Sequence, residues 1–291
     1  MKYNSVFTVI PTFFTSEGIF MEAILKHIDN QRIKQIKNIV ILGTTSESCT
    51  LSVEERKTIA VTIWKKFNKE LNIVIGLSGN NTKDVKEETY SLKDYCHAFM
   101  LSAPYYNKPS QHGIYEHYKE IVSSCEKEFI IYNVPSRCGV NIEPTTIAKL
   151  ANTFKNVVAI KEASGSIEQV MKIKSLCNIN ILSGDDALTL PFMSIGATGV
   201  ISVISNIIPE VMLNIINTFN KGNISESNII FYKYYELMKL AFCDSNPVPI
   251  KYMMSLKYCD DCLSSVRLPL VELLDDNKNK ITTELHRLLL I

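Results

Sequence analysis

The chain has 291 residues, with 31 basic and 30 acidic side chains and a formal net charge of +1. The charges are spread along the sequence without a basic stripe, which argues against binding to nucleic acid or to a membrane surface. The length suits either two domains or a single α/β barrel of about 250 residues.

Targeting and redox signals are weak. The apolar run within Met1–Pro11 is too short for a signal peptide, and no stretch approaches the ~18 uninterrupted apolar residues of a spanning helix. We therefore expect a cytoplasmic protein. Its eight cysteines are scattered, so we expect reduced thiols. The single CxxC, Cys259–Cys262, has no second ligand pair nearby, and we expect no metal site.

Short β-branched runs recur along the chain and alternate with stretches of helical periodicity. The predicted strands are Val6–Ile10, Ile39–Leu42, Ile73–Ile75, Ala98–Leu101, Phe129–Tyr132, Val157–Ile160, Ile179–Leu182 and Gly199–Val203. The predicted helices between them include Val53–Phe67, Thr82–Tyr95, Gln111–Cys125 and Ile167–Cys177. Ser52, followed three residues later by Glu55, resembles a capping box.

Eight apolar strands that alternate with helices predict a closed (β/α)₈ TIM barrel rather than an open doubly wound sheet. Helical patterns continue after the eighth strand, at Pro209–Lys221, Ser225–Phe242, Pro247–Lys257 and Asn277–Leu290. We expect residues 1–224 to form the catalytic barrel. Residues 225–291 are expected to form a C-terminal helical extension packed on the barrel, because no Gly-, Pro- or Ser-rich linker separates the two.

Catalytic groups of a barrel lie at the carboxyl ends of its strands. Lys161 ends the apolar run Val157–Ile160, and a lysine there that loses its proton can attack a ketone. Tyr132, at the end of the preceding strand, can shuttle the proton that leaves with water. Thr44 can hold the tyrosine hydroxyl, and Thr44 and Thr45 can donate to a carboxylate. Taken singly, most of these residues are better explained by a structural role.

Several motifs occur together in one order, and together they are far more specific than any one of them. They are Gly43–Ser48, Pro104–Gln111, Tyr132–Gly139, Ile160–Ala163, Ser183–Asp186 and Asn246–Pro247. In these segments the chain resembles the dihydrodipicolinate synthase family, within a superfamily that includes N-acetylneuraminate lyase. The resemblance runs nearly end to end, from Thr12 and Gly18 to Arg267–Pro269.

The resemblance implies a class I aldolase-type lyase of lysine and diaminopimelate biosynthesis. Lys161 would form a Schiff base with pyruvate, which would then condense with aspartate semialdehyde to 4-hydroxy-tetrahydrodipicolinate without a dissociable cofactor. Tyr132, Thr44 and Tyr106 would form a proton relay, with Tyr106 reaching into a neighbouring subunit's site. The assembly would be a homotetramer of two tight dimers. The implied substrate-binding residues are Thr45, Arg137, Gly184 and Val203, with Arg137 receiving the carboxylate of the second substrate.

The chain departs from the family pattern at three points. The family usually reads Gly-Thr-Thr-Gly-Glu, and here Ser46 replaces the second glycine. If that position needs a positive φ, the serine carries strain or the loop shifts. Pro11–Phe13 stands where Thr-Pro is expected, and Cys138 replaces a threonine. Two rival functions stay open. One is a lyase for a sialic acid or a 2-keto-3-deoxy sugar acid, against which Arg137 argues. The other is a catalytically silent barrel that serves in binding or assembly, for which Ser46 is the best support.

Feedback inhibition by lysine is the last implied property. The positions that match the family's effector site include Ser48, Cys49, Asn80, Asp84 and Tyr105. Inhibited members commonly carry histidines where this chain has Val53 and Arg56. Since Val53 offers no polar contact and Arg56 adds a permanent positive charge, we predict weak or absent inhibition.

Overall fold

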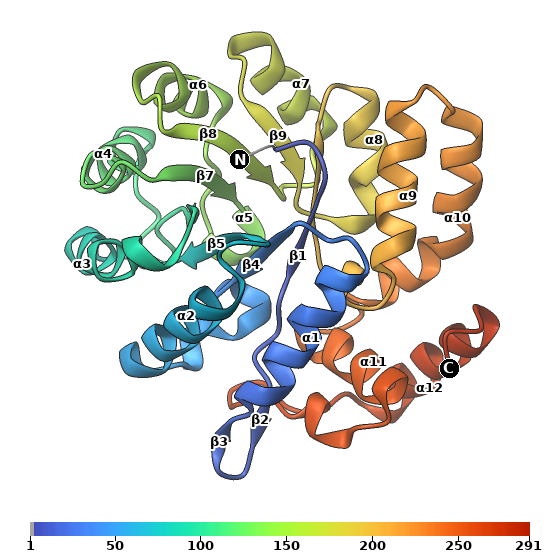
Figure 1. The fold of residues 1–291 in the computed structure, drawn as a ribbon. Helices are drawn as coiled ribbons and strands as arrows, with labels where there is room; N and C mark the ends of the chain where they lie inside the picture. The colour runs from blue at the N-terminus through green and yellow to red at the C-terminus, as the bar shows by residue number, and fades with distance from the viewer. Residues whose placement is uncertain (1–2) are drawn as a thin grey trace. The chain divides into compact units, whose positions relative to one another are not determined.

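A closed barrel of parallel strands forms the centre of the fold in the computed structural model, which describes residues 3–291 (Figure 1). Residues 1 and 2, where the predicted barrel segment starts, lie outside the described residues. Around the barrel the strand order is β1-β10-β9-β8-β7-β6-β5-β4. The barrel strands are β1 (Val6–Val9), β4 (Asn38–Ile41), β5 (Asn72–Leu77), β6 (Ala98–Ser102), β7 (Glu128–Asn133), β8 (Val157–Glu162), β9 (Asn180–Ser183) and β10 (Gly199–Ser202).

Helices follow the strands in the alternation that the sequence predicts, and the colour gradient of Figure 1 traces it. The α-helices are α1 (Met21–Ile33), α2 (Val53–Phe67), α3 (Thr82–Leu92), α4 (Gln111–Val122), α5 (Pro135–Cys138), α6 (Pro144–Thr153), α7 (Ile167–Leu176), α8 (Thr189–Ser194), α9 (Pro209–Asn220), α10 (Ile224–Leu240), α11 (Val248–Tyr258) and α12 (Asp275–Arg287). Short 3₁₀ turns add η1 (Thr44–Ser46), η2 (Ser48–Thr50), η3 (Lys93–Tyr95), η4 (Asp186–Leu188), η5 (Ile204–Asn206) and η6 (Asp261–Ser264).

Contacts divide the chain into two compact units. Unit 1 consists of Asn72–Ile201 together with the residues up to Ser5, and unit 2 consists of Val6–Leu71 and Ser202–Ile291. A helical part therefore follows the last barrel strand, as predicted, but it clusters with the first strands and helices. The predicted boundary between residues 224 and 225 stays a prediction.

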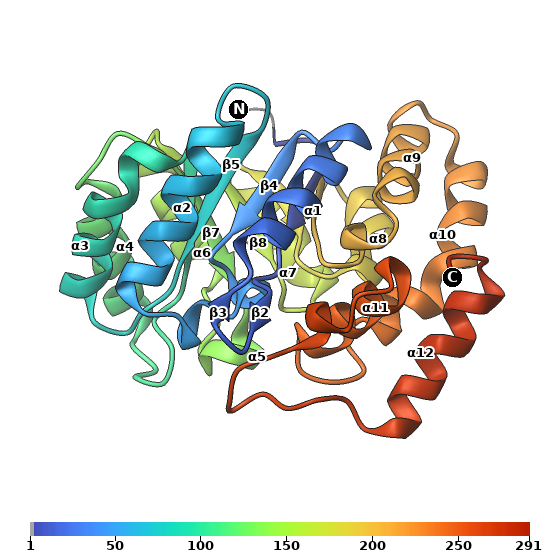
Figure 2. The same ribbon diagram turned by 60° about the horizontal axis from the view of Figure 1, so that its bottom comes forward.

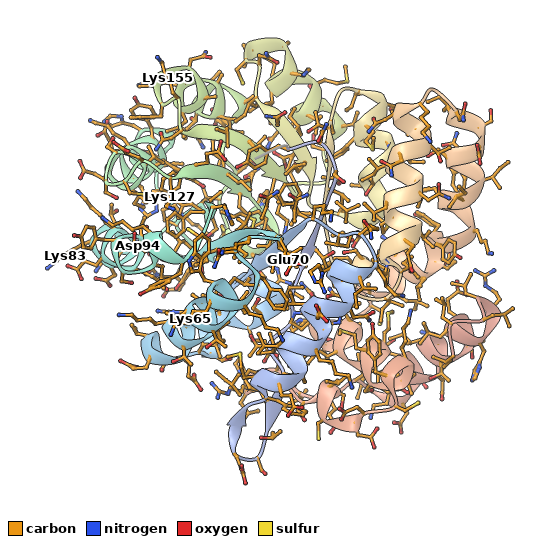
Figure 3. All side chains as sticks on the ribbon, viewed as in Figure 1. Lys65, Glu70, Lys83, Asp94, Lys127 and Lys155 are labelled. Carbon is orange, nitrogen blue, oxygen red and sulfur yellow. The ribbon has the colours of Figure 1, made fainter. Side chains whose placement is uncertain are left out.

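Unit 1 is built on the neighbouring strands β5 to β9 and on β10 up to Ile201. Strands β5 to β9 pair in parallel from Val74 opposite Ala98 to Glu162 opposite Ser183, with one register shift between Phe129 and Ile130 where β7 pairs with β8. Helices α3, α4, α6 and α7 pack in sequence, each against the next. The apolar strand residues are buried, whereas charged helix and loop residues such as Lys83 and Lys155 extend outward (Figure 3). Burial of this apolar surface is the main stabilising contribution.

Unit 2 combines the β1–β4 pair with the C-terminal helices. Helix α9 packs on α10, and α12 contacts both α10 and α11 (Figure 2). Helix α11 is largely buried, including the side chain of Lys251. Helix α2 begins at the predicted capping box, in which Ser52 Oγ accepts from Glu55 N and Glu55 accepts from Ser52 N.

The described part of the chain carries neither a membrane-crossing helix nor a metal-binding cluster. No helix in residues 3–291 combines the length and the apolar character that a bilayer crossing needs. Within the same residues, no group of three or more His, Cys, Asp or Glu side chains is arranged to hold a metal ion. All eight cysteines, which fall within this range, are free thiols.

Candidate active site

Lys161 and Tyr132 lie side by side at the carboxyl ends of β8 and β7. They are register partners in the parallel ladder, so both side chains leave the sheet on the same face. The Lys161 amine lies 4.3 Å from the centroid of the Tyr132 ring, and both residues are buried, with Lys161 only 6% exposed. An amine and a phenol in this arrangement are the two groups that imine chemistry needs, a nucleophile and a proton carrier.

Gly184 follows β9, the next strand of the barrel. A Cβ at this position would lie 2.6 Å from Ala163 Cβ and 3.1 Å from Lys161 Cε, which is too close for any side chain. Its amide donates to Glu162 O at 2.8 Å. The requirement for glycine is therefore steric, and the predicted substrate-binding position lies directly beside the lysine.

Arg137 lies on the short helix α5, which directly follows β7. The helix begins with Pro135 and ends at Gly139, whose φ of +71° is a left-handed conformation that glycine favours. Arg137 is exposed, and within residues 3–291 it forms no ion pair with a carboxylate. The guanidinium is therefore accessible to an incoming anion.

Cys138 links this helix to the loop after β6. Its thiol donates to Ala103 O at 3.3 Å, and its carbonyl accepts from Tyr106 N at 3.3 Å. Burial raises the pKa of this thiol to about 11, so it stays protonated and acts as a donor at neutral pH. The cysteine therefore serves as a hydrogen-bonding residue at the position where the family carries threonine.

A buried polar network fixes the segment that carries Arg137. The Glu162 carboxylate is fully buried and accepts from Asn133 Nδ2 at 3.1 Å, from Gln169 Nε2 at 2.8 Å and from Ser164 N at 2.7 Å. Asn133 Oδ1 in turn accepts from Ile142 N at 3.0 Å. Asn141 also belongs to this network, because its Oδ1 accepts from Asn133 Nδ2 at 2.8 Å. Neither Gln169 nor Asn141 was singled out from the sequence, since no local pattern in a helix or loop identifies the partner of a carboxylate at the end of a strand.

In unit 2, the loop after β4 carries Thr44 and Thr45. In this loop the residues with a positive φ are Leu42, at 57°, and Glu47, at 54°, whereas Ser46 lies in the turn η1. Ser46 is instead anchored, because its hydroxyl donates to Ile10 O at 2.6 Å and its carbonyl accepts from the Thr12 hydroxyl at 2.7 Å. Ser46 therefore does not adopt a positive φ, and it carries no strain of that kind.

Residues of the C-terminal helical part hold this loop from the other side. Lys251, fully buried, donates to Glu47 Oε1 at 2.7 Å, and the Arg267 amide donates to Glu47 Oε2 at 3.0 Å. Burial lowers the pKa of Lys251 to about 8, although the Glu47 carboxylate opposes that shift. Asn246 Nδ2 donates to the Thr45 hydroxyl at 2.9 Å. In the sequence, Glu47, Asn246 and Arg267 were recognised only as parts of motifs, without their partners, and Lys251 was not singled out.

Comparisons with known proteins agree with this geometry. The family model for the dihydrodipicolinate synthetase family matches residues 2–288. The chain belongs to this family. A 4-hydroxy-tetrahydrodipicolinate synthase of Endomicrobium trichonymphae is 40% identical over 281 residues, which cover 96% of each chain.

Solved structures of synthetases of this family are similar over the whole chain. The 4-hydroxy-tetrahydrodipicolinate synthase of Methylacidiphilum fumariolicum SolV superposes with a TM-score of 0.95 at 35% identity, covering 98% of this chain and 96% of that one. A structure described as the first monomeric dihydrodipicolinate synthase variant gives a TM-score of 0.96 at 30% identity, covering 99% and 98%. The predicted (β/α)₈ fold and the predicted family are confirmed.

Within this chain, the remaining predicted residues fall in the two units separately. Val203 in unit 2 is buried at the start of η5, and its carbonyl accepts from Asn206 Nδ2 at 2.8 Å. Tyr106 in unit 1 is 87% exposed and has a φ of +70°. Such a conformation costs about 1–2 kcal/mol outside glycine, so an outward-facing tyrosine is held here at a cost.

The predicted effector positions are likewise divided between the units. Ser48 is buried in η2, and Arg56 Nη1 lies 3.5 Å from its carbonyl oxygen. Cys49 and Val53 are exposed. In unit 1, Asn80 and Asp84 are exposed and Tyr105 is half-buried. The guanidinium of Arg56 thus points toward Ser48, one of the positions that would have to admit a lysine effector.

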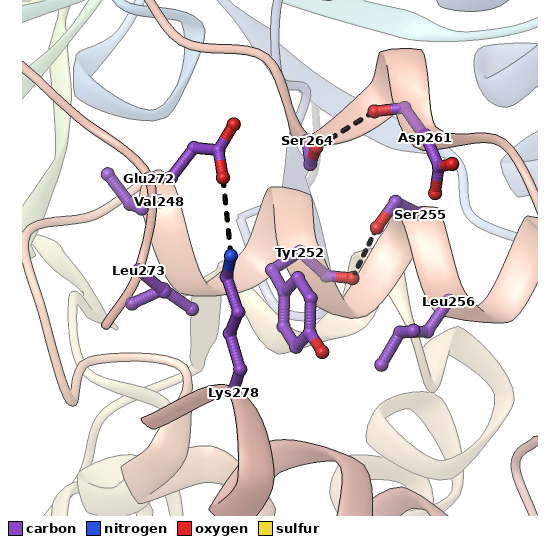
Figure 4. Close-up of a pocket in the computed structure, with 9 residues that line it drawn as sticks. All are labelled: Val248, Tyr252, Ser255, Leu256, Asp261, Ser264, Glu272, Leu273 and Lys278. Atoms are coloured by element: carbon purple, nitrogen blue, oxygen red, sulfur yellow. Dashed lines mark hydrogen bonds and ion pairs between the residues drawn. The ribbon is translucent and has the colours of Figure 1, made fainter. Parts of the chain in front are cut away.

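Unit 2 also contains a pocket of about 250 Å³ (Figure 4). Its lining residues are Val248, Tyr252, Ser255, Leu256, Asp261, Ser264, Glu272, Leu273 and Lys278. Lys278 pairs with Glu272 at 3.2 Å, and the Ser255 and Ser264 hydroxyls donate to backbone carbonyls. Because these polar groups already bond to the protein, the pocket offers few groups for a ligand.

Proposed function

We propose that the chain condenses pyruvate with L-aspartate 4-semialdehyde to 4-hydroxy-tetrahydrodipicolinate, a step of lysine and diaminopimelate biosynthesis. The pairing of Lys161 with Tyr132 at the ends of β8 and β7 is the observation that carries this proposal. It is supported by the names of relatives that match nearly the full chain. The reaction class is that of a class I aldolase-type lyase.

Lys161 is proposed to attack C2 of pyruvate and, after loss of water, to form an imine. The protonated imine withdraws electrons, so a proton can leave C3 and the resulting enamine can attack the aldehyde carbon of the second substrate. The amino group of that substrate then attacks C2, which closes the ring and releases the lysine. The imine is the electron sink in each step, and we propose that no dissociable cofactor or metal takes part.

Tyr132 is proposed to carry the protons that these steps exchange, in a relay with Thr44 and with Tyr106 of a neighbouring subunit. The position of Tyr132 beside Lys161 supports its own part in the relay. Thr44 lies in the loop after the barrel strand β4, which ends at Ile41, and catalytic groups of this fold occur in such loops. The high exposure of Tyr106 supports a role outside its own subunit.

Arg137 is proposed to bind the carboxylate of aspartate semialdehyde, and Thr45, Gly184 and Val203 to take part in substrate binding. An exposed guanidinium without a carboxylate partner supports the first assignment. The close approach of Gly184 to Lys161 supports a place beside the imine. A neutral sugar hydroxyl in place of the carboxylate would leave the guanidinium without its preferred bidentate partner.

We further propose a homotetramer of two tight dimers in the cytoplasm. Tyr106 supports a tight dimer, because an exposed tyrosine in a costly backbone conformation fits a contact with a second copy. Sedimentation of wild type and Tyr106→Phe tests this. We expect both to be oligomers and the variant to turn over more slowly; a fully active monomer would contradict the shared relay.

A coupled assay tests the proposed reaction. Purified protein is supplied with pyruvate and L-aspartate 4-semialdehyde, and the product is followed by its reduction with dihydrodipicolinate reductase and NADPH. In parallel, N-acetylneuraminate and 2-keto-3-deoxygluconate are tested for release of pyruvate. Turnover of the first pair alone supports the proposal, whereas cleavage of a sugar acid without condensation would assign the chain to the rival lyase class.

A further inference from the structure

We propose that Asn246, in the C-terminal helical part, is a positioning residue that directs the hydroxyl proton of Thr45 toward the carboxylate of pyruvate. This inference rests on the proposed function, in which Thr45 binds substrate. It assigns to the segment after the barrel a task in substrate recognition.

The first observation is the direction of one hydrogen bond. Asn246 Nδ2 donates to Thr45 Oγ1 at 2.9 Å, and both side chains are buried. A hydroxyl has one proton and two acceptor lone pairs. Because the amide occupies an acceptor site, the Thr45 proton has to point elsewhere, and within residues 3–291 no acceptor takes it. The hydroxyl is thus prepared to donate to an anion.

A second observation concerns the other end of the same amide. Asn246 Oδ1 is buried and has no hydrogen-bond partner among the described residues. An unsatisfied buried acceptor destabilises the fold, and native proteins seldom carry one without a reason. The amide is therefore oriented by its bond to Thr45 and not by a network of its own.

A third observation is the rigidity of both partners. Glu47, two residues after Thr45, receives the buried Lys251 amine at 2.7 Å and the Arg267 amide at 3.0 Å. Lys251 lies on α11, which begins directly after Asn246-Pro247. Its amine also donates to Ser265 O. The buried ion pair between Lys251 and Glu47 thus joins helix α11 to the loop that carries Thr45. It holds the Asn246 amide and the Thr45 hydroxyl at a fixed separation.

A double-mutant cycle tests this mechanism. The variants Asn246→Ala, Thr45→Val and the double variant are saturated with pyruvate, and the imine is trapped with borohydride and quantified by mass. Loss of a hydrogen bond to a charged group should raise the half-saturation concentration by about tenfold or more in each single variant. If Asn246 acts through Thr45, the double variant should match Thr45→Val alone, since the effects of coupled residues do not add.

Two controls separate positioning from general damage. Asn38→Ala removes another buried asparagine of unit 2, whose amide donates to Val6 O, and should change the half-saturation by less than about twofold. Trapping of the neutral ketone hydroxyacetone should be affected little by Asn246→Ala, because that ligand lacks the carboxylate. If Asn246→Ala does not fold, Asn246→Ser replaces it, as its shorter side chain cannot keep the 2.9 Å contact.

The outcomes are distinct. Additive effects in the double variant, an unchanged half-saturation in Asn246→Ala, or equal losses for pyruvate and hydroxyacetone would each overturn the positioning role. They would leave the proposed function intact, provided that wild type traps pyruvate. Absence of trapping in wild type would remove both the proposed function and this inference.

Discussion

The Lys161 amine lies 4.3 Å from the centre of the Tyr132 ring because the two residues are register partners on β8 and β7. Neighbouring strands lie about 4.8 Å apart, so the parallel ladder places the two side chains next to each other. The nucleophile and the proposed proton carrier are therefore positioned by backbone hydrogen bonds of the barrel.

Arg137→Ala should impair condensation far more than imine formation. We expect kcat/KM for aspartate semialdehyde to fall by about two orders of magnitude, because a charged hydrogen-bond partner of the second substrate is lost. Arg137→Lys keeps the charge but loses the planar fork and should recover part of the activity. Borohydride trapping of pyruvate serves as the control measurement; an equal loss there would show that Arg137 has a structural role.

Lysine should inhibit weakly or not at all. Arg56 points toward the Ser48 carbonyl, and its permanent charge opposes a ligand that carries two ammonium groups. We expect less than half-inhibition at about 1 mM lysine, the weak end of ordinary small-ligand affinities. A Val53→His/Arg56→His double variant should bind lysine more tightly. Full inhibition of wild type below that concentration would contradict the prediction.

Lys251→Met should destabilise the fold strongly. The substitution keeps the length of the side chain but leaves the Glu47 carboxylate buried without its cation, which costs about 3–5 kcal/mol. The double variant Glu47→Gln/Lys251→Met removes both charges and should recover a large part of that loss. Urea denaturation gives the free energies of unfolding. Lys83→Met, at an exposed pair, is the matched control, and a loss as small as in the control would refute the importance of the buried pair.

Stability should fall as the pH drops from about 6.5 to 4. Burial lowers the pKa of both His27 and His117 to about 4, so both are neutral in the folded state at neutral pH. The unfolded chain binds protons at these residues from pH ~6.5 downward. At pH 4, each histidine therefore lowers the free energy of unfolding by roughly 3 kcal/mol. Urea denaturation at pH 7, 5.5 and 4.5 measures this loss. The free energy of unfolding should depend less steeply on pH in His117→Asn than in wild type. An equal pH dependence in that variant would argue against a contribution of His117.

The barrel could be predicted because its determinants are local. All eight predicted strands match observed ones to within about two residues, since buried parallel strands read as continuous apolar runs. Helix α2 begins at the capping box that Ser52 and Glu55 indicate. The hairpin of β2 (Phe14–Thr15) and β3 (Gly18–Ile19) was not predicted, because strands of two residues are too short to show a period.

The candidate site was accessible from sequence only in part. Strand ends pointed to Lys161 and Tyr132, since each directly ends an apolar run. The partners of Glu162 and of Thr45 could not be found in this way. Gln169 and Asn246 are joined to them by tertiary hydrogen bonds, and the sequence spacing of such bonds carries no period. The Ser46 position shows the same limit, because only the structure reveals that Glu47 takes the left-handed conformation.

Trapping of the pyruvate imine tests the central claim most directly. Wild type is incubated with pyruvate and borohydride, digested, and mapped by mass spectrometry, with Lys161→Met and Lys251→Met as comparison variants. The reduced adduct of pyruvate with lysine should occur at Lys161, be absent from Lys161→Met and persist in any folded Lys251→Met protein. An adduct at another lysine, or none in wild type, would contradict the Schiff-base mechanism.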